Sequence, residues 1–448
     1  MSLPTRPSDI RVREAEAFFA PVRARTPFSF GNVVATDLTV CHVRVQVENR
    51  RGAVAKGWGA IVLSYPWAMP GGELVPDDKD RCMRQEVERL CRRAADLREF
   101  AHPIDLFAGL DGEAAPELPR LAALVCAAPL DAALHDAFGN VNGIATYDGY
   151  GPDHCAFDLS RYLGEEYRGR YVRDFLRRTP LPRVVIAHTV GGLDPLRASD
   201  VSADAADDGL PHALEGWIAR DGVRAFKVKL LGRDLGWDLD RLIAVHRVAR
   251  EAVGDATAPI HLSVDLNEQC VSAEYPDAYL RRLREIAPET YAALSYVEQP
   301  APRDLGDDAF DLSAVSALKP VVLDEGLTSI AALDRAEALG WSGIALKTCK
   351  CQSLMLLALA RATEAAMLVT VQDLSNPGLA LLQSVGLAAR MTSPSPLEAN
   401  ARQYFPEASA PEAAIHPGVF GVHNGTVSTE ALSGSGLGYR FGDVRRGK

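Results

Sequence analysis

The sequence predicts an α/β protein: a (β/α)7β barrel, similar to a TIM barrel, with an α+β domain capping it. From Arg183 onward, short apolar strands alternate with amphipathic helices in eight regular units. Before that point, two alternating strands precede a run of helices, a pattern typical of an α+β domain. We therefore expect residues 1–182 to form the cap and 183–401 the barrel, with the Gly- and Pro-rich residues 402–448 returning across the surface toward the cap.

The composition is that of an ordinary folded protein with an acidic surface. The chain has 448 residues, 47% of them hydrophobic and 24% charged, a length that allows two or three cores. The formal net charge of -11 argues against nucleic acid or an anionic membrane as a partner, since phosphate binding needs a basic surface. An anionic substrate must therefore meet its cations inside a local site.

We expect a cytoplasmic protein. No apolar run typical of a signal peptide follows the basic start, and no apolar run appears long enough to cross a bilayer. The eight cysteines are scattered, and we expect them to be reduced and buried. Cys349 and Cys351 form a C-x-C pair without a second pair or a histidine cluster, so we do not assign a zinc site there.

In the cap, alternation predicts two antiparallel strands separated by a turn at Arg50–Gly52, and helical periodicity predicts two long helices. The strands are Asp37–Glu48 and Gly57–Ser64, and the helices are Asp80–Leu97 and Pro116–Gly139.

Two cap loops are candidates for setting substrate specificity, and the second of them is also a candidate lid over the barrel. Thr26–Thr36 carries Phe30, and Tyr65–Arg81 is long and carries Trp67 and a Gly pair. Loops of the latter length are usually functional or disordered. The acidic loop Asp194–Asp208 is expected to be a solvated loop that would also be able to close the site.

The barrel strands are short apolar runs, each followed by polar residues. They are Arg183–Val190, Ala225–Leu230, Ile260–Asn267, Leu294–Pro300, Pro320–Gly326, Gly343–Thr348, Met367–Asp373 and Ser395–Ala401. A doubly wound open sheet is the alternative arrangement. Eight regular units without a Gly-rich phosphate loop favour the barrel.

Three successive strands end in carboxylates, Asp265, Glu298 and Asp324. The carboxyl ends of barrel strands meet at one mouth, where the chemistry of such barrels takes place. A lone charge there is more often a solvated rim residue or a helix cap. Three converging carboxylates would repel one another unless a cation lay between them, and oxygen ligands select a hard ion such as Mg²⁺.

Lysines stand on two other strands. Because strand residues alternate sides, Lys227 and Lys229 both point inward, about 6.6 Å apart along the strand. Lys347 ends the sixth strand, on the far side of the barrel. Mutual repulsion and a nearby metal would lower the pKa of a lysine, which would then be able to act as a general base. The alternative is that a lysine only pairs with Asp265 or Glu298 in a buried network.

Five motifs follow the second to sixth strands in order: Lys-Val-Lys, Asp-Leu-Asn, Glu-Gln-Pro, Asp-Glu-Gly and Leu-Lys-Thr-Cys-Lys. Together they resemble the enolase superfamily, in particular the muconate-lactonizing-enzyme-like branch of its mandelate racemase and muconate lactonizing enzyme family. The similarity covers about residues 20–440. Pro129–Asn140 also resembles the helix that these proteins carry before the barrel.

The resemblance implies roles by position. The three strand-end carboxylates would bind Mg²⁺, with Glu325 the less suitable neighbour of a ligand. Lys229 would be the base on one face of the substrate's α-carbon, Lys347 the acid or base on the opposite face, and Lys227 would help to hold the carboxylate. We assign six residues to the substrate pocket: Asn267, Glu325, Asp373, Glu398, Phe30 and Trp67.

Removing the α-proton of a carboxylate gives an enediolate with two negative charges on its oxygens, which a divalent metal and Lys227 would stabilise. We therefore predict a Mg²⁺-dependent isomerase or lyase acting on a small carboxylate, with racemase, epimerase or cycloisomerase activity. Similar proteins are commonly homo-oligomers, and we expect the same here.

Two departures from the family pattern leave the reaction open. No histidine ends the seventh strand, as it does in the mandelate-racemase-like branch, although Asp373 or Glu398 would supply an acid for an acid-sugar dehydratase. Lys350–Ser353 stands where the related branch usually has a Gly pair, which leaves the substrate undetermined. His188 on the first strand is either a site residue or a packing residue.

Two other classes are weighed against this prediction. A Schiff-base aldolase would also use a barrel lysine, and a non-catalytic binding protein would keep the fold without the reaction. The complete set of carboxylates and lysines speaks against both.

Overall fold

The cap begins with a sheet of three long antiparallel strands. The computed structural model describes residues 4–30, 33–111, 117–205 and 207–443, without the side chains of 27–30, 33–35, 111 and 443. Strands β1 (Ile10–Phe30), β2 (Val33–Asn49) and β3 (Val54–Val62) pair in that order. The predicted turn lies between β2 and β3, where Gly52 adopts a φ of +80° that glycine tolerates best.

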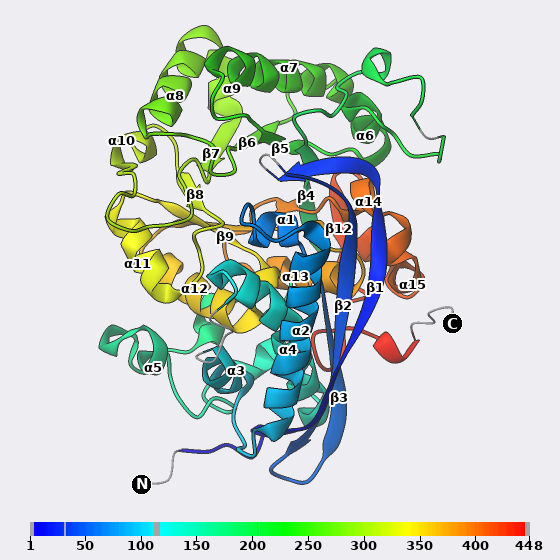
Figure 1. Cartoon of the computed structure of the whole chain (residues 1–448), viewed down its shortest axis with the longest axis vertical. Coiled ribbons are helices and arrows are strands. Elements are labelled where there is room, and N and C mark those ends of the chain that lie inside the picture. Colours follow the sequence, from blue (N-terminus) through cyan, green and yellow to red (C-terminus); the bar gives the residue numbers. More distant parts are fainter. Residues whose placement is uncertain (1–3, 31–32, 112–116, 206, 444–448) are drawn as a thin grey trace.

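Two long helices, α2 (Pro76–Asp96) and α4 (Arg120–Asn142), pack on this sheet (Figure 1). Both confirm predicted helices, with shifted ends. The sequence did not predict β1 or α3 (Pro103–Asp111). The short helices α1 (Tyr65–Ala68) and α5 (Ser160–Leu163) complete the region before the barrel.

Helix α4 lies unusually close to β3, and two glycines make this possible. A Cβ atom added at Gly59 would lie 2.1 Å from the Pro129 carbonyl oxygen. A Cβ atom at Gly57 would lie 2.2 Å from the backbone nitrogen of Ala137. Within the described ranges, α4 is the one helix long and apolar enough to cross a membrane by length and composition. This corrects the expectation that no such apolar run exists. In the folded protein, 94% of the apolar window of α4 is buried.

Eight parallel strands form the barrel and coincide with the eight predicted runs. They are β4 (Arg183–Val190), β5 (Ala225–Lys229), β6 (His261–Asp265), β7 (Leu294–Glu298), β8 (Val321–Leu323), β9 (Gly343–Leu346), β10 (Leu368–Val371) and β11 (Leu397–Glu398). Neighbours in sequence pair from β4 to β10, and β11 pairs with β4. A parallel bridge between Gln372 and Glu398 joins the end of β10 to β11 and closes the ring.

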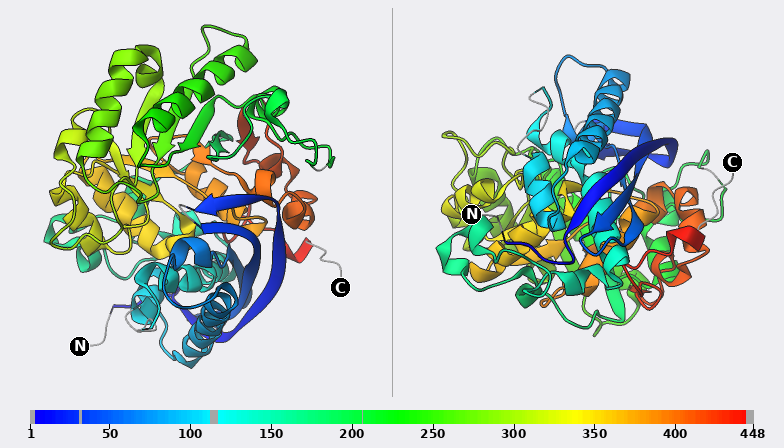
Figure 2. Two further views of the ribbon diagram at one scale, coloured as in Figure 1. Left: turned by 45° about the horizontal axis from the view of Figure 1, so that its top comes forward. Right: turned by 90° about the horizontal axis from the view of Figure 1, so that it is seen from below.

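Helices on the outside connect successive strands (Figure 2). They are α6 (Leu214–Asp221), α7 (Leu235–Val253), α8 (Glu274–Ile286), α9 (Pro288–Ala293), α10 (Ser313–Ser316), α11 (Ile330–Ala338), α12 (Gln352–Glu364) and α13 (Leu379–Ala389). Their apolar faces and the strands form the largest core, and the cap sheet with α2 and α4 forms a second one. The (β/α)7β barrel with an α+β cap is confirmed.

The C-terminal segment runs from the barrel back to the cap. It contains α14 (Ala401–Tyr404), α15 (Ala410–Ala413), α16 (Pro417–Phe420) and β12 (Thr426–Ser428), and β12 pairs antiparallel with β4. The Leu437 N–H donates to Asp136 of α4 at 2.9 Å, and Phe441 stacks on Trp58 of β3 with ring centroids 4.0 Å apart. These contacts support a returning segment, while the domain boundaries stay a prediction.

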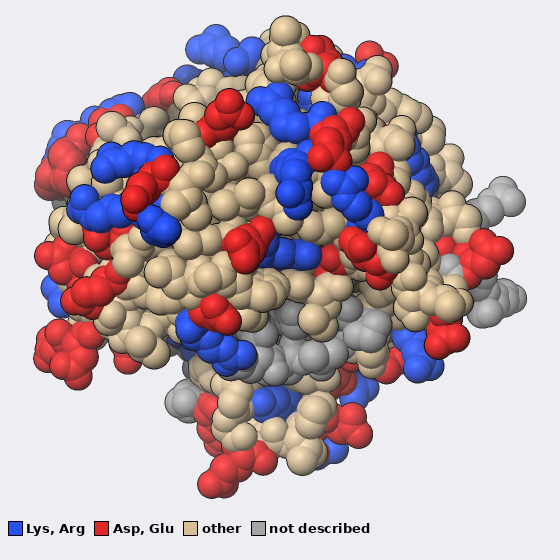
Figure 3. All heavy atoms as spheres, turned by 90° about the horizontal axis from the view of Figure 1, so that it is seen from above, with Lys and Arg blue, Asp and Glu red and all other residues tan. Residues whose placement is uncertain are grey.

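The acidic loop Asp194–Asp208 is anchored to the cap at its far end. Arg25 of β1, with its side chain 8% exposed, forms an ion pair with Asp208 and donates to the carbonyl oxygen of Leu210 at 2.9 Å. Most of the described loop is exposed, as expected. On the face of the molecule shown in Figure 3, acidic and basic side chains are mixed without a continuous basic patch.

Candidate active site

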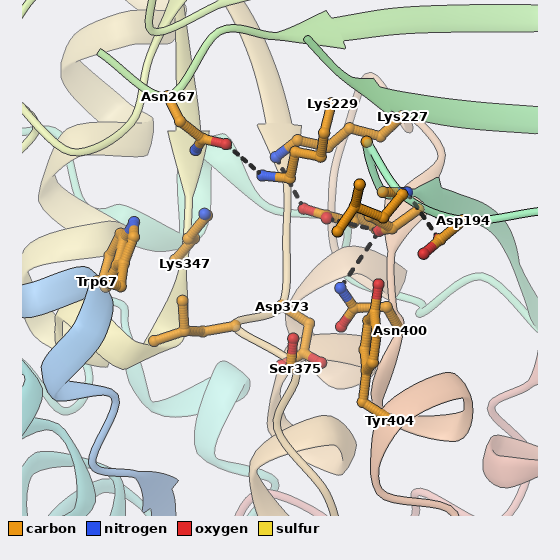
Figure 4. A pocket seen from close by; sticks show the side chains of 16 residues that line it. Trp67, Asp194, Lys227, Lys229, Asn267, Lys347, Asp373, Ser375, Asn400 and Tyr404 are labelled. Atoms are coloured by element: carbon orange, nitrogen blue, oxygen red, sulfur yellow. Dashed lines mark hydrogen bonds and ion pairs between the residues drawn. The ribbon is translucent and has the colours of Figure 1, made fainter. Parts of the chain in front are cut away.

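Lys227 and Lys229 both lie inside the barrel mouth, as their spacing predicts. Both come from β5 and line the same cavity (Figure 4). The parallel register places Lys229 beside Asp265 of β6, and Asp265 beside Glu298 of β7. One level of the barrel therefore carries a lysine and two carboxylates on successive strands.

Lys227 is enclosed by carboxylates. Its Nζ lies 2.6 Å from Glu298 Oε1, 3.0 Å from Asp265 Oδ2 and 3.0 Å from Glu398 Oε2, and it also donates to Gln372 at 3.1 Å. Burial alone would lower the pKa of Lys227, but Asp265, Glu298 and Glu398 outweigh burial and raise this pKa well above its usual value. The expected lowering by neighbouring lysines is therefore absent at Lys227, because the carboxylates dominate.

Lys229 is the more accessible of the pair. Its side chain is 18% exposed, and its Nζ donates to Asp265 at 2.6 Å and to Asn267 at 3.0 Å. Asn267 follows β6 with a φ of +40°, a strained conformation of the kind found at functional sites. A substrate in the cavity can therefore reach Lys229 more easily than Lys227.

Lys347 faces the cavity from the end of β9, across the barrel from β5. Its Nζ lies 2.6 Å from Asp324 Oδ2 and 5.0 Å from the centroid of the Trp67 ring. Burial would lower the pKa of Lys347, but Asp324 and more distant carboxylates raise it above its usual value. In this arrangement Lys347 is an ammonium ion.

Lys350 is a site residue that the sequence analysis did not assign. It is fully buried and donates to Asp324 at its backbone oxygen (2.9 Å) and at Oδ1 (3.2 Å). Burial lowers the pKa of Lys350, and Lys347 adds to this effect. Burial also acts against ionised Asp324, yet Lys347 and Lys350 together lower the pKa of Asp324 to about 2. The second lysine of Leu-Lys-Thr-Cys-Lys was the available signal, but the turn Thr348–Lys350 that folds it beneath Asp324 is visible only in the structure.

Asp265 and Glu298 are both fully buried, and their pKa values shift in opposite directions. Burial raises the pKa of Glu298 to about 8, and repulsion by Asp265 adds to the rise. Burial acts in the same direction on Asp265, but Lys227 and Lys229 lower its pKa well below the usual range. Gln372, at the end of the seventh barrel strand and without a role assigned from the sequence, donates its amide N–H to Glu298 Oε2 at 2.7 Å.

Glu325 connects the site to the cap. The indole N–H of Trp67 donates to Glu325 Oε1 at 2.9 Å, and the amide of Asn267 donates to the same oxygen at 3.2 Å. Burial, followed by repulsion from Asp324 and Asp265, raises the pKa of Glu325 to about 7. The other oxygen, Glu325 Oε2, is buried without a hydrogen-bond partner among the described residues.

The predicted lid at Tyr65–Arg81 is only partly a loop, because it contains α1 and the start of α2. Trp67 belongs to α1 and is 2% exposed in the barrel mouth. Arg303 donates to the backbone oxygen of Trp67 at 3.2 Å and forms an ion pair with Glu268. The barrel thus holds Trp67 at its backbone through Arg303 and at its indole through Glu325.

Asp373, Glu398 and Asn400 form the wall at the ends of β10 and β11. Thr189 of β4 donates to Glu398 at 2.7 Å, and the Asn400 amide donates to Thr189 at 3.3 Å. Asp373 is 3% exposed, and its Oδ2 accepts the backbone N–H of Asn376 at 2.9 Å. Burial raises the pKa of Asp373 to about 7, and hydrogen bonding by Asn376 offsets only part of this rise.

The buried cluster carries excess negative charge. Six carboxylates belong to it: Asp265, Glu298, Asp324, Glu325, Asp373 and Glu398. Four lysines lie beside them: Lys227, Lys229, Lys347 and Lys350. With every group ionised, two negative charges remain uncompensated, the charge that one divalent cation would neutralise.

The chemistry of these donors fits a hard cation. They are buried oxygens, and Glu325 Oε2 has an unused lone pair. In the described part of the chain, no three acidic, His or Cys side chains are arranged to hold an ion as they stand. The lysines account for this, because Lys227 lies against Asp265 and Glu298 while Lys347 lies against Asp324.

Of the remaining sequence candidates, one lies outside the described side chains and one lies away from the cavity. The side chain of Phe30 lies outside the described residues. His188 is buried away from the cavity, where its Nδ1 contacts Arg402 at 3.0 Å and its ring packs against Trp217. It is a packing residue. Cys349 and Cys351 are buried free thiols, and all eight cysteines are unpaired, as expected.

Comparison with known proteins places this geometry in a family. Residues 210–443 match the family model described as Enolase C-terminal domain-like. None of the curated proteins searched matches the chain.

Three solved structures illustrate the similarity over nearly the whole chain. The L-Ala-D/L-Glu epimerase from Bacillus subtilis is 15% identical with a TM-score of 0.63, over 96% of this chain and 98% of that one. A mandelate racemase/muconate lactonizing protein from Herpetosiphon aurantiacus is 20% identical with a TM-score of 0.62, over 98% and 99%. The dipeptide epimerase from Enterococcus faecalis, solved with Mg and the dipeptide L-Leu-L-Tyr, is 16% identical with a TM-score of 0.61, over 96% and 99%.

These structures share the fold at low identity, and the family model extends over just over half of the chain, from the end of the first barrel loop to the C-terminal segment. The chain therefore belongs to the enolase superfamily, in its mandelate racemase and muconate lactonizing enzyme family.

Proposed function

We propose that this protein is a Mg²⁺-dependent isomerase that removes the α-proton of a small carboxylate substrate, acting as a racemase or epimerase. One observation carries the proposal: Lys229 and Lys347 enter one cavity from strands on opposite sides of the barrel. Two proton-transfer groups on opposite faces of an α-carbon are what inversion requires. The printed names of similar structures, which are epimerases, agree with this reaction.

Asp265, Glu298 and Asp324 would hold the metal, since they are buried oxygen donors at adjacent strand ends. When bound, Mg²⁺ supplies positive charge where the substrate carboxylate becomes more negative. A similar structure contains Mg together with its dipeptide ligand.

Lys229 takes the α-proton from one face of the substrate. The C–H bond breaks, and its electron pair moves into the carboxylate to give an enediolate. Lys347, held as an ammonium ion by Asp324, donates a proton to the opposite face, and the new C–H bond has inverted configuration. Lys227 stays protonated among its carboxylates and contributes fixed positive charge near the developing oxyanions. Cycloisomerisation remains within this proposal, with one lysine acting only as a counter-charge.

Deuterium incorporation at the α-carbon tests the two-lysine assignment. The wild type is incubated with Mg²⁺ in D₂O with a panel of carboxylates and followed by NMR. We expect Lys229→Ala and Lys347→Ala each to lose exchange with at least one enantiomer of the substrate. Lys319→Ala is the matched control, because Lys319 donates to the backbone oxygen of Leu294, at the start of β7. Full exchange in both site variants would rule out the assignment.

An acid-sugar dehydratase is the second candidate, and Asp373 favours it. A buried carboxyl with a pKa of about 7 beside the cavity is suited to protonate a leaving hydroxyl. A keto product, detected as a semicarbazone across sugar acids and lost in Asp373→Asn, would support this reaction over racemisation.

The proposal includes a small carboxylate as partner, the cytoplasm as location and a homo-oligomeric assembly. Light scattering on the purified protein would test the assembly.

A further inference from the structure

A second cavity lies on the side of the barrel and shares no lining residue with the cavity at the mouth. Three helices of four residues each, α14, α15 and α16, follow β11 in place of a single long helix. Figure 1 shows α14 and α15 on the side of the barrel that carries β12, the strand paired with β4. Between these short helices, β4 and α13 remains a space of about 360 Å³, compared with about 60 Å³ at the mouth.

The walls of this side cavity are mostly apolar. An apolar cavity of about 150 Å³ is large enough to bind benzene, so the side cavity has room for a chain or ring system of roughly eight to fourteen non-hydrogen atoms. Its size and lining match those of small-molecule sites in general, which combine apolar walls with a few polar groups. The buried apolar residues of the lining are Ile186, Leu381, Val385, Ala399, Val419, Val422 and Val427.

The polar part of the lining is cationic. Arg402 of α14, with its side chain 16% exposed, donates through Nε to Asp221 Oδ2 at 2.8 Å and through Nη2 to His188 Nδ1 at 3.0 Å. Arg220, which is exposed at the rim, lies with its Nε 3.7 Å from the other oxygen of Asp221. Two guanidinium groups therefore share one carboxylate, and the lining carries one uncompensated positive charge.

The buried guanidinium of Arg402 is only partly compensated. Burial lowers the pKa of Arg402, and the attraction of Asp221 offsets only part of this effect. The hydrogen bonds of Arg402 to described residues use one N–H group on each of its three nitrogens, the third bond going to the backbone oxygen of Ala399. A guanidinium has five N–H groups, so a further acceptor can bind here. A carboxylate is the acceptor that a guanidinium binds most strongly.

We propose that the side cavity is a second small-molecule site, which binds an apolar monocarboxylate of roughly eight to fourteen non-hydrogen atoms. The carboxylate lies at Arg402, and the chain or ring lies among the apolar walls. The uncompensated positive charge determines the anionic end of the ligand, and the apolar lining determines the rest. This inference is independent of the proposed reaction, because the lysines and carboxylates of the mouth do not line the side cavity.

Calorimetric titration with sodium octanoate tests the site. A chelator is present, so that the mouth holds no divalent cation. Octanamide has the same chain without the charge, and acetate has the charge without the chain. We expect octanoate to bind about tenfold or more tightly than octanamide, because hydrogen bonds to a charged group are the stronger ones. Acetate should bind more weakly still, since it buries almost no apolar surface.

Two variants of α15 and its end locate the ligand. Ala413→Phe places a ring in the side cavity, and Ala414→Phe, at the exposed next position outside the lining, is the matched control. We expect Ala413→Phe to weaken octanoate binding by about tenfold or more, because the ring occupies the space of the chain. Ala414→Phe should bind octanoate like the wild type. Unchanged affinity in folded Ala413→Phe would overturn the inference.

Charge variants test the anionic end. Arg402→Gln should remove the preference for octanoate over octanamide, and Arg402→Lys should retain part of it. Because Arg402 is buried, Arg220→Gln at the exposed rim provides a second charge variant, and we expect it to weaken octanoate and leave octanamide unchanged. Equal binding of octanoate and octanamide by the wild type would overturn the inference, as would the absence of octanoate binding.

Lys229→Ala separates the side cavity from the mouth. Wild-type affinity for octanoate in this variant supports the side cavity, since Lys229 lines only the mouth. Lost affinity would place octanoate at the mouth and overturn the inference. The deuterium-exchange test of the proposed function is decided separately, because it uses Mg²⁺ and follows the α-proton.

Discussion

Two buried polar clusters of this protein contain chemically similar groups. They differ in whether each polar group has a hydrogen-bond partner and each charge a counter-charge. The first is the barrel mouth. The second joins the cap helix α4 to α12 and consists of Asp131, His135, Tyr150 and Ser353, each at most 2% exposed. Ser353 donates to Asp131 at 2.7 Å, His135 lies 2.8 Å from the Ser353 hydroxyl, and Tyr150 lies 2.9 Å from the other ring nitrogen.

The second cluster contains a serine, a histidine and an aspartate in contact, but its hydrogen bonds run in the wrong direction for a nucleophile. The Ser353 hydroxyl donates to Asp131, so it accepts from His135, which in turn accepts from Tyr150. Burial lowers the pKa of His135 well below its usual value, which keeps the ring neutral. These four residues form a linear chain of hydrogen bonds that connects the cap to the barrel, a structural joint between the two.

In the barrel mouth, donors and acceptors are not fully matched. The mouth has two more carboxylates than lysines, unpaired oxygens on Glu325 and Asn400, and positive φ at Asn267, Gln299 and Ser375. Burial of polar groups is common to both clusters, and only the mouth combines it with uncompensated charge, unused acceptors and strain. The unsatisfied cluster is the one proposed to carry the chemistry, and the satisfied cluster is a structural joint between cap and barrel.

The largest expected contrast between the clusters is catalytic. Lys347→Met removes the group proposed to protonate one face of the substrate, and we expect α-proton exchange to fall by about 10²–10⁴-fold. Ser353→Ala should keep the wild-type exchange rate per folded molecule. NMR-detected exchange on both variants checks this, and equal losses in the two would show that the mouth and the α4–α12 cluster do not differ in catalytic importance.

The second contrast concerns metal. Because the mouth has two uncompensated negative charges and several buried oxygen donors, saturating Mg²⁺ should stabilise the fold by about 2.7 kcal/mol at a concentration of 100 times Kd. Urea unfolding with Mg²⁺ and with a chelator measures the gain. Glu298→Gln should lose most of it, while Ser353→Ala should retain it in full. A gain that survives in Glu298→Gln would place the ion elsewhere.

The third contrast concerns stability without metal. Ser353→Ala removes the hydrogen bond to the buried Asp131 carboxylate and leaves that oxygen without its donor, so the free energy of unfolding should fall by about 1.5–3 kcal/mol. Ser199→Ala, at an exposed hydroxyl that donates to Asp200, should change it by less than about 0.5 kcal/mol. A loss at Ser353 as small as that at Ser199 would mean that the joint contributes little.

The sequence predicted the barrel and much of its mouth because both depend on local patterns. Alternating strands and helices set the strand ends, and the strand ends set Lys229, Asp265 and Glu298 side by side. β1 was missed because most of its described residues are at least partly exposed, which leaves no strong hydrophobic alternation. Lys350 was missed because its role depends on a turn that brings it beneath Asp324.

The wall formed by Asp373, Glu398 and Asn400 shows the same limit. Asp373 and Asn400 stand at predicted strand ends, but their hydrogen bonds depend on where Asn376 and Thr189 lie in the folded chain. The joint between α4 and α12 was also invisible in the sequence, since His135 and Ser353 are 218 residues apart. Whether a buried polar group finds a hydrogen-bond partner depends on how the folded chain packs around it. The difference between the two clusters therefore appears only in the structure.

The last expected effect is a pH dependence at Asp373. Burial raises the pKa of Asp373 from 3.8 to about 7, with a further contribution from Glu398. A raised pKa in the folded state means that the folded protein holds the proton more tightly, so this contribution to stability is present below about pH 4 and is lost as the pH rises to about 7. The stability of the wild type relative to Asp373→Asn, measured by urea unfolding without metal, should therefore decrease between these pH values by at most about 1.4 kcal/mol per unit and then level off. The other carboxylates of the mouth titrate in both proteins and largely cancel in the difference. A difference that stays constant with pH would show that Asp373 is already satisfied in the folded protein, and the mouth would then resemble the joint more closely than its geometry indicates.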